Sequence, residues 1–339
     1  MIPLSKFYES ILGTKTYKLS LDAGCTCPNR DGTKGLGGCI FCSESGSGDF
    51  AASRNLSIKE QVASAKKLVE SKVKGRSGSR NGKYIAYFQN FTSTYGNPKS
   101  LVKKYEEALE CEDIEGLAIA TRPDCLGEEI LSQIAKIAEN HFVQIELGLQ
   151  TSNEVTGNLI NRCYTNEDYK DAVKRIKKAS EKIHIVTHLI FGLPGETEED
   201  MLESVRFVVR ENTKNSSQSE GEHREIACLE ESYLNKKNSV SSVYSVSSVR
   251  NLKPQFGIKI TTLYIVQNTR LAQMYESGTV TPLSKEEYFS LLKKALALLP
   301  ENCVIHRLTG DPPKKTLLAP LWTTDKKRVM NQLKLLISN

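Results

Sequence analysis

Short apolar runs alternate with longer amphipathic segments along most of this 339-residue chain. The apolar runs are rich in β-branched and aromatic residues, as is typical of strands buried inside a sheet. They predict strands at residues 17–21, 84–91, 116–120, 142–149, 183–191, 258–266 and 304–308.

The segments between these runs carry apolar residues at helical spacing among many charges, which predicts helices with one buried face. Ser57 and Thr197 stand directly before two of these segments, at positions where N-cap residues are favoured. The predicted helices cover residues 58–73, 99–109, 128–139, 166–182, 198–211, 285–299 and 325–336.

Strand and helix follow each other at the spacing of βαβ units, so we expect an α/β fold with a parallel sheet covered by helices. Open parallel sheets and parallel barrels both place their chemistry at the C-terminal ends of the strands. Residues 213–250 interrupt this pattern with a run rich in Ser, Asn, Lys and Glu, which predicts a largely disordered insertion.

The composition, 39% hydrophobic and 25% charged, is that of a globular protein. No apolar run approaches the roughly 20 residues that span a bilayer, and no secretory signal is evident, so we expect a cytoplasmic protein without a membrane partner. Thiols stay reduced there, and the nine cysteines are better explained by metal binding and core packing than by disulfides. The net charge of +6 agrees with an anionic partner such as RNA but does not require one.

Four cysteines, Cys25, Cys27, Cys39 and Cys42, lie in the segment AGCTCPNRDGTKGLGGCIFC. Thiolates at this density indicate a site for a soft metal, and the spacing alone fits four-thiolate zinc as well as an iron–sulfur cluster. Three observations disfavour zinc. The chain has a large α/β core that needs no zinc staple, the loop follows the first strand of the βα series, and Phe41 precedes the last cysteine.

The segment CPNRDGTKGLGGCIFC resembles the cluster loop of the radical S-adenosylmethionine (SAM) enzymes, and in particular of their YhcC/YtqA-like branch, which is related to the Elongator catalytic subunit. Similar blocks follow in order: YFQNFTSTYG, GLAIATRPDCL, IELGLQT, INR, HLIFGLPGET and HRLTGDPPKKTLLAPLW. The resemblance covers nearly the whole chain except residues 213–250. It implies a partial (β/α)6 TIM-like barrel over residues 1–310, which includes the cluster loop 25–42, with a C-terminal extension over residues 311–339.

The resemblance also implies that Cys27, Cys39 and Cys42 bind a [4Fe–4S] cluster, whose open iron chelates SAM. Cys25 is then interpreted as an apolar filler at the end of a strand. Residues expected to contact the cofactor are Gln89, Glu146, Gln150, Arg162, Ile190 and Gly192. Residues expected to contact substrate are Arg122, Asp124, His306 and Arg307.

Each of these positions also has a structural interpretation. Gln89 could belong to a hydrogen-bonded loop, and Glu146 could be exposed beyond the sheet. Arg162 could form a surface salt bridge, and Gly192 could serve a strand-to-helix turn.

The resemblance implies reductive cleavage of SAM followed by abstraction of a hydrogen atom from substrate. For substrate it points to tRNA, in which a carboxymethylaminomethyl group at C5 of the wobble uridine would become an aminomethyl group. A reductant such as flavodoxin or ferredoxin would supply the electron. Two alternatives remain: a radical SAM enzyme acting on a small molecule or a protein, and a non-catalytic, zinc-bound RNA-binding protein.

Overall fold

The computed structural model describes residues 1–44, 46, 51–73, 82–214 and 255–338. The predicted insertion at residues 213–250 lies almost entirely outside the described residues.

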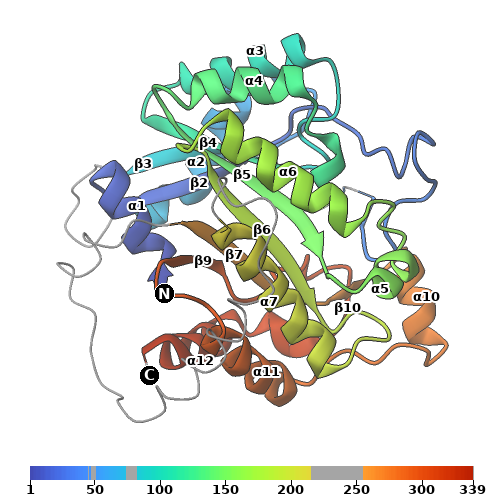
Figure 1. The fold of residues 1–339 in the computed structure, drawn as a ribbon. Helices are drawn as coiled ribbons and strands as arrows, with labels where there is room; N and C mark the ends of the chain where they lie inside the picture. Colours follow the sequence, from blue (N-terminus) through green and yellow to red (C-terminus); the bar gives the residue numbers. More distant parts are fainter. Residues whose placement is uncertain (45, 47–50, 74–81, 215–254, 339) are drawn as a thin grey trace.

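Eight parallel strands form one curved sheet in the order β1-β9-β7-β6-β5-β4-β3-β2 (Figure 1). The strands are β1 (Ile2–Pro3), β2 (Thr16–Leu21), β3 (Lys83–Phe88), β4 (Ile114–Thr121), β5 (Phe142–Gln150), β6 (His184–Phe191), β7 (Phe256–Thr262) and β9 (Cys303–Arg307). A separate antiparallel ribbon consists of β8 (Ile265–Val266) and β10 (Leu317–Ala319).

The predicted α/β half-barrel is confirmed. Its sheet contains the seven predicted strands, the last of them as β9, and β1 adds an eighth. The predicted strand 258–266 divides in two. Leu263 still donates a hydrogen bond to the Phe191 carbonyl at 2.8 Å, but the chain then leaves the sheet and β8 pairs with β10.

The long helices cover the outer face of the curved sheet, as the amphipathic segments predict, and shorter ones lie at its two ends. The structure contains the following helices. They are α1 (Leu4–Leu12), α2 (Ile58–Val73), α3 (Pro98–Leu109), α4 (Glu128–Ile137), α5 (Glu154–Leu159), α6 (Asn166–Ala179), α7 (Glu198–Thr213), α10 (Arg270–Glu276), α11 (Lys285–Ala297) and α12 (Lys326–Ser338), with 3-10 turns η1 (Pro123–Cys125) and η2 (Leu321–Thr324). Every predicted helix is confirmed, and Thr197 caps α7 in a capping box with Asp200. The sequence missed α1, α5 and α10, which have nine, six and seven residues and are too short to show a clear period.

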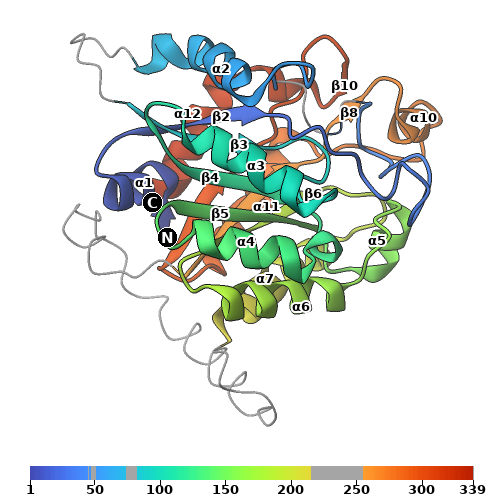
Figure 2. The ribbon, with the colours of Figure 1, turned by 90° about the horizontal axis from the view of Figure 1, so that it is seen from above.

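The two ends of the half-barrel are closed by different parts of the chain. Figure 2 shows α1 at one end of the sheet, and α5, α10 and the β8–β10 ribbon at the other. Phe7 and Tyr8 of α1 are each 2% exposed and form an apolar cluster with Ile85 and Val304 from the inner face of the sheet. The α1 helix therefore plugs the N-terminal end of the barrel and leaves the C-terminal end for chemistry.

In the part of the chain that the structure describes, no helix has both the length and the apolar surface needed to cross a bilayer.

The plug formed by α1 can be tested with Phe7→Ala. The ring packs against His184, with centroids 4.4 Å apart, and against Phe142. Its removal leaves a cavity, and we expect the free energy of unfolding to fall by about 3–5 kcal/mol in urea titrations. Ile11→Ala on the same helix is the matched control, because Ile11 is 47% exposed, and its effect should stay within about 0.5 kcal/mol. Equal effects of the two substitutions would show that α1 does not plug the barrel.

Candidate active site

A cavity of about 530 Å³ lies inside the half-barrel, which is within the range of roughly 300–1,000 Å³ typical of small-molecule sites. Six neighbouring strands each contribute a side chain to its lining: Lys18, Tyr87, Ala120, Glu146, His188 and Lys259. The loop after β2 and the turn after β4 also border it. This is the position at which parallel α/β folds place their chemistry.

Three of the four clustered cysteines, Cys27, Cys39 and Cys42, line this cavity. Cys25 does not, because its side chain is buried in the main apolar core on the other side of the sheet end. Burial raises the pKa of the Cys25 thiol to about 11, which keeps it neutral and unsuited to bind metal. The structure thus places three of the four thiols at the cavity and the fourth in the apolar core.

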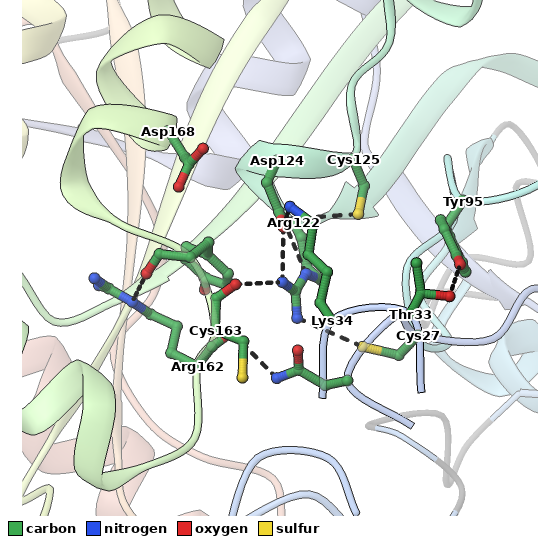
Figure 3. A network of polar contacts seen from close by, with 12 residues as sticks. Cys27, Thr33, Lys34, Tyr95, Arg122, Asp124, Cys125, Arg162, Cys163 and Asp168 are labelled. Carbon is green, nitrogen blue, oxygen red and sulfur yellow. Dashed lines mark hydrogen bonds and ion pairs between the residues drawn. The ribbon is translucent and has the colours of Figure 1, made fainter. Parts of the chain in front are cut away.

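Arginines lie beside the cavity thiols, and Figure 3 shows Arg122 directed toward Cys27. Arg122 Nη1 lies 3.8 Å from Cys27 Sγ. The pKa of the Cys42 thiol is lowered, chiefly by a hydrogen bond from Cys39 and further by the Arg30 guanidinium. The pKa of Cys39 is raised because it donates that bond and is buried. Arginines beside thiols favour the thiolate form, which is the form that binds metal.

The turn after β4 fixes Arg122 in this position. Asp124 accepts two hydrogen bonds from the Arg122 guanidinium, at 2.9 and 2.8 Å. It also forms an ion pair with Lys34 of the cysteine loop at 2.6 Å. Arg122 also donates to the Cys163 carbonyl at 3.2 Å. Arg122 lines the cavity and Asp124 lies behind it, so their observed contacts are with the cysteine loop, and their contact with substrate stays a prediction.

A second support for the cysteine loop comes from Asn29, which the sequence analysis did not single out. Its amide Nδ2 donates to the Asn161 carbonyl at 2.6 Å and lies 3.8 Å from Cys39 Sγ. Arg162, next in the chain to Asn161, is fully buried and donates to the carbonyls of Leu149 and Thr151. Arg162 does not line the cavity, and its expected cofactor contact stays a prediction.

The remaining predicted cofactor residues differ in their placement. Gln89, Gln150 and Ile190 line the cavity, whereas Gly192 does not. Gln150 Oε1 is buried without a hydrogen-bond partner among the described residues, as expected of an atom that awaits a ligand. Gly192 adopts a positive φ of 88° in the turn that follows β6, and its N–H points to Met201 Sδ at 3.1 Å.

Glu146 lies at the floor of the cavity and already has partners within the chain. Lys18 Nζ lies 2.6 Å from Oε1, while Lys259 and the Tyr87 hydroxyl donate to Oε2. Burial alone would raise the pKa of Glu146, but the two lysines hold it well below its usual range. Its expected role in binding the cofactor stays a prediction.

The sequence analysis missed Lys18 and Lys259. The available signal was a lysine in the middle of each of two strands that are otherwise apolar, TYKLSL and FGIKITT. Such a residue is rarely buried unless it is paired.

His306 and Arg307 are adjacent in β9 but face different surroundings. Arg307 lines the cavity and lies beside Lys259 in the β7–β9 register. The His306 ring lies below it, with Nε2 2.9 Å from His184 Nε2 and its ring packed near Phe7 of the plug. Burial lowers the pKa of His306 well below its usual value, so the ring is neutral. Of the two, only Arg307 is placed to meet a substrate in this cavity.

Comparison with known proteins identifies the family. Residues 27–208 match the family described as "Radical SAM superfamily", and residues 256–337 match "Radical_SAM C-terminal domain". The chain belongs to the radical SAM superfamily. This family implies a [4Fe–4S] cluster and SAM as cofactors.

Several relatives are similar to this radical SAM chain, two of them over most of its length. "Uncharacterized protein YtqA" of Bacillus subtilis (strain 168) is 34% identical over 321 residues, which cover 95% of this chain and 84% of that protein. "Protein YhcC" of Escherichia coli (strain K12) is 30% identical, with 95% and 87% covered. A tRNA-2-methylthio-N(6)-dimethylallyladenosine synthase of Thermotoga petrophila is 34% identical over 113 residues, which are 32% of this chain and 25% of that protein.

Among solved structures, the archaeal Elp3 of Methanocaldococcus infernus superposes with a TM-score of 0.59 at 16% identity. The match covers 96% of this chain and 64% of that chain. At this identity the likeness supports the fold, and it agrees with the predicted relation to the Elongator catalytic subunit.

The residues present fit the two cofactors that the family implies. Three thiols border one cavity beside two arginines, and the side chain of Gln150 lines the same cavity. Among the described residues, no three Cys, His, Asp or Glu side chains are close enough to hold a single metal ion. The ligands of an iron–sulfur cluster each bind a different iron, so they stand farther apart than the ligands of one zinc ion.

The division of the cysteines predicts their substitution phenotypes. We expect Cys27→Ala, Cys39→Ala and Cys42→Ala each to lose most of the iron that the wild-type protein takes up during anaerobic reconstitution, because each removes one cluster thiolate. Cys25→Ala is the control and should keep wild-type iron and acid-labile sulfide, since Cys25 packs in the apolar core. Wild-type iron content in Cys39→Ala, or one zinc per chain in the native protein, would contradict the assignment.

Glu196, in the turn between β6 and α7, should make stability depend on pH. Burial raises its pKa to about 7, although the Thr151 hydroxyl donates to its carboxylate. Between about pH 4.5 and pH 7 the folded state therefore holds a proton that the unfolded chain has released. The free energy of unfolding falls as the pH rises through this range. Glu196→Gln cannot ionise, so its stability relative to wild type should increase from pH 5 to pH 8 in urea titrations. Glu129→Gln, at an exposed position in α4, should show a flat difference, and a flat difference for Glu196→Gln as well would refute this prediction.

Proposed function

We propose that this radical SAM protein modifies the C5 side chain of the wobble uridine in tRNA, converting a carboxymethylaminomethyl group into an aminomethyl group. Cys27, Cys39 and Cys42 would hold the [4Fe–4S] cluster. The observation that carries the proposal is the placement of these three thiols, with Arg122 and Arg30 beside them, at the rim of a cavity deep enough to take a cofactor and a substrate side chain.

Gln89, Gln150 and Ile190 would border SAM. When bound, the cluster and SAM together supply reductive cleavage of the sulfonium and abstraction of a hydrogen atom from the substrate. The protein's own part is to orient the reacting groups and to exclude water. The apolar plug under the cavity and the helices around the sheet would keep water out of the cavity and hold its lining residues in place.

Two observations support a nucleic acid as substrate. A relative that matches a third of the chain is named for its action on tRNA. The cavity rim carries Phe91 between two arginines, with the guanidinium carbons of Arg30 and Arg54 at 5.5 and 5.3 Å from the ring centroid. A ring flanked by cations can contact bases and phosphates together.

We place the reaction in the cytoplasm, with a flavodoxin or ferredoxin as the electron donor. The electron donor follows from the family's need for a low-potential reductant, and the compartment from the free cysteines among the described residues.

The decisive experiment incubates the reconstituted protein anaerobically with SAM, dithionite and tRNA that carries carboxymethylaminomethyluridine. We expect 5′-deoxyadenosine to form together with aminomethyluridine at the wobble position, both detected by mass spectrometry. Cys39→Ala should form neither product. Formation of 5′-deoxyadenosine with no change in any nucleoside would instead favour a small-molecule or protein substrate.

A further inference from the structure

The floor of the cavity carries more positive charge than the chain neutralises. Lys18 from β2 and Lys259 from β7 reach across the half-barrel to the single carboxylate of Glu146. Arg307 stands next to Lys259 in the register of β7 and β9 and lines the same cavity. Two buried lysines thus share one carboxylate, and Arg307, whose side chain is 43% exposed, adds a third positive charge beside them.

Charged residues at the rim of the cavity do not neutralise this excess of positive charge. Asp311 lies 3.9 Å from Arg307, but it also pairs with Lys326 at 2.9 Å. Both residues line the cavity too. Four cations therefore face two carboxylates among the charged groups at this side of the cavity.

Hydrogen-bond donors are also left over at the floor. An ammonium group has three N–H donors. Among the described residues, Lys18 directs one to Glu146, and Lys259 directs one to Glu146 and one to Tyr87. Donors therefore remain on both lysines, whose side chains are only 16% and 12% exposed.

Such an arrangement is costly without a further anion. Buried charges and donors that lack a partner destabilise the folded state. Burial lowers the pKa of Lys259 only to about 8, so its ammonium form still prevails at neutral pH. An anion that enters the cavity binds more strongly for this reason, because the donors that it contacts are already fixed in position and desolvated.

We infer that Lys18, Lys259 and Arg307 form a subsite that binds the carboxylate of the substrate at the floor of the barrel. This assignment rests on the proposed function for the identity of the substrate, whose carboxymethyl end is a carboxylate on a slender chain. Glu146 and Tyr87 act as positioning residues, because they hold the two ammonium groups apart and aimed into the cavity.

The geometry favours a carboxylate on the substrate over other anions. Lys18 and Lys259 line the cavity and are only 16% and 12% exposed, so a group that meets both of them must enter the cavity. A backbone phosphate of RNA carries a ribose on each side and cannot descend between the strands. The carboxylate of SAM is the other source of the same chemistry, and the experiment separates the two.

Binding is measured with the reconstituted enzyme and SAM, using anticodon stem-loops that differ in one group at the wobble uridine. One carries the carboxymethylaminomethyl group, and the other carries its neutral carboxamide. We expect the wild-type enzyme to bind the carboxylate form about tenfold more tightly in fluorescence anisotropy, since charge-assisted hydrogen bonds are lost in the amide.

Lys259→Met and Arg307→Gln should each reduce this preference to about twofold or less, while the affinity for the carboxamide form stays the same. Lys259→Arg keeps the charge and should retain a clear preference, which separates loss of the subsite from loss of the fold. Lys294→Met, on the outer helix α11, is the matched control and should preserve the full preference. Equal binding of the two stem-loops by the wild-type enzyme would overturn the inference.

A small probe separates this inference from the proposed function. N-benzylglycine and its amide present the same carboxylate and amide without RNA, and calorimetry with the enzyme–SAM complex measures both. If the stem-loops fail to bind but N-benzylglycine binds more tightly than its amide and Lys259→Met abolishes the difference, the subsite stands and the tRNA proposal falls. If neither probe pair shows a preference, the subsite falls. A loss of SAM affinity in Lys259→Met with an unchanged carboxylate preference would assign the floor to SAM and overturn the inference.

Discussion

One carboxylate, that of Glu146, joins opposite sides of the half-barrel. It lies on β5 in the middle of the sheet, and its partners stand on β2 and β7, which are three and two strands away. Side chains so far apart in a flat sheet could not meet, so these contacts require the curvature that creates the cavity. Removing one member of a buried charge group leaves the others unpaired, which typically costs about 3–5 kcal/mol. The shape of the sheet and the charge of its interior therefore depend on each other.

The cysteine loop depends on supports that come from elsewhere in the chain. Arg122 and Asp124 hold it from the end of β4, and Asn29 binds it to the loop that contains Asn161 and the buried Arg162. A long loop rich in glycine would otherwise have many conformations, and fixing it costs conformational entropy. Because these supports also donate toward sulfur, the same contacts that order the loop prepare its thiols for a metal.

The sequence reveals the repeating architecture and the end of the sheet where chemistry occurs, but not how side chains meet inside the barrel. Strands and long helices follow from periodicity, and the cysteines stand out by their spacing. The pairing of Lys18 with Glu146 could not be predicted, because it links strands separated by 128 residues and depends on curvature. His306 illustrates a related difficulty. It lies next to Arg307, yet it packs near Phe7 of the plug while Arg307 lines the cavity, because β9 shifts its register against β7 between Ile305 and Arg307 and regular alternation is interrupted there. Helix α1, whose role is to close the barrel, is too short for its amphipathic pattern to indicate a partner.

The pairing of β1 with β9 also bears on how the protein is made. Ile2 and Pro3 align with Val304 and Ile305, so the first strand cannot enter the sheet until these two residues of β9 have left the ribosome. Contacts of such long sequence separation form slowly. During synthesis the amino-terminal segment therefore stays unpaired, with its aromatic residues exposed to solvent. A chaperone that binds this segment would protect the nascent chain from aggregation.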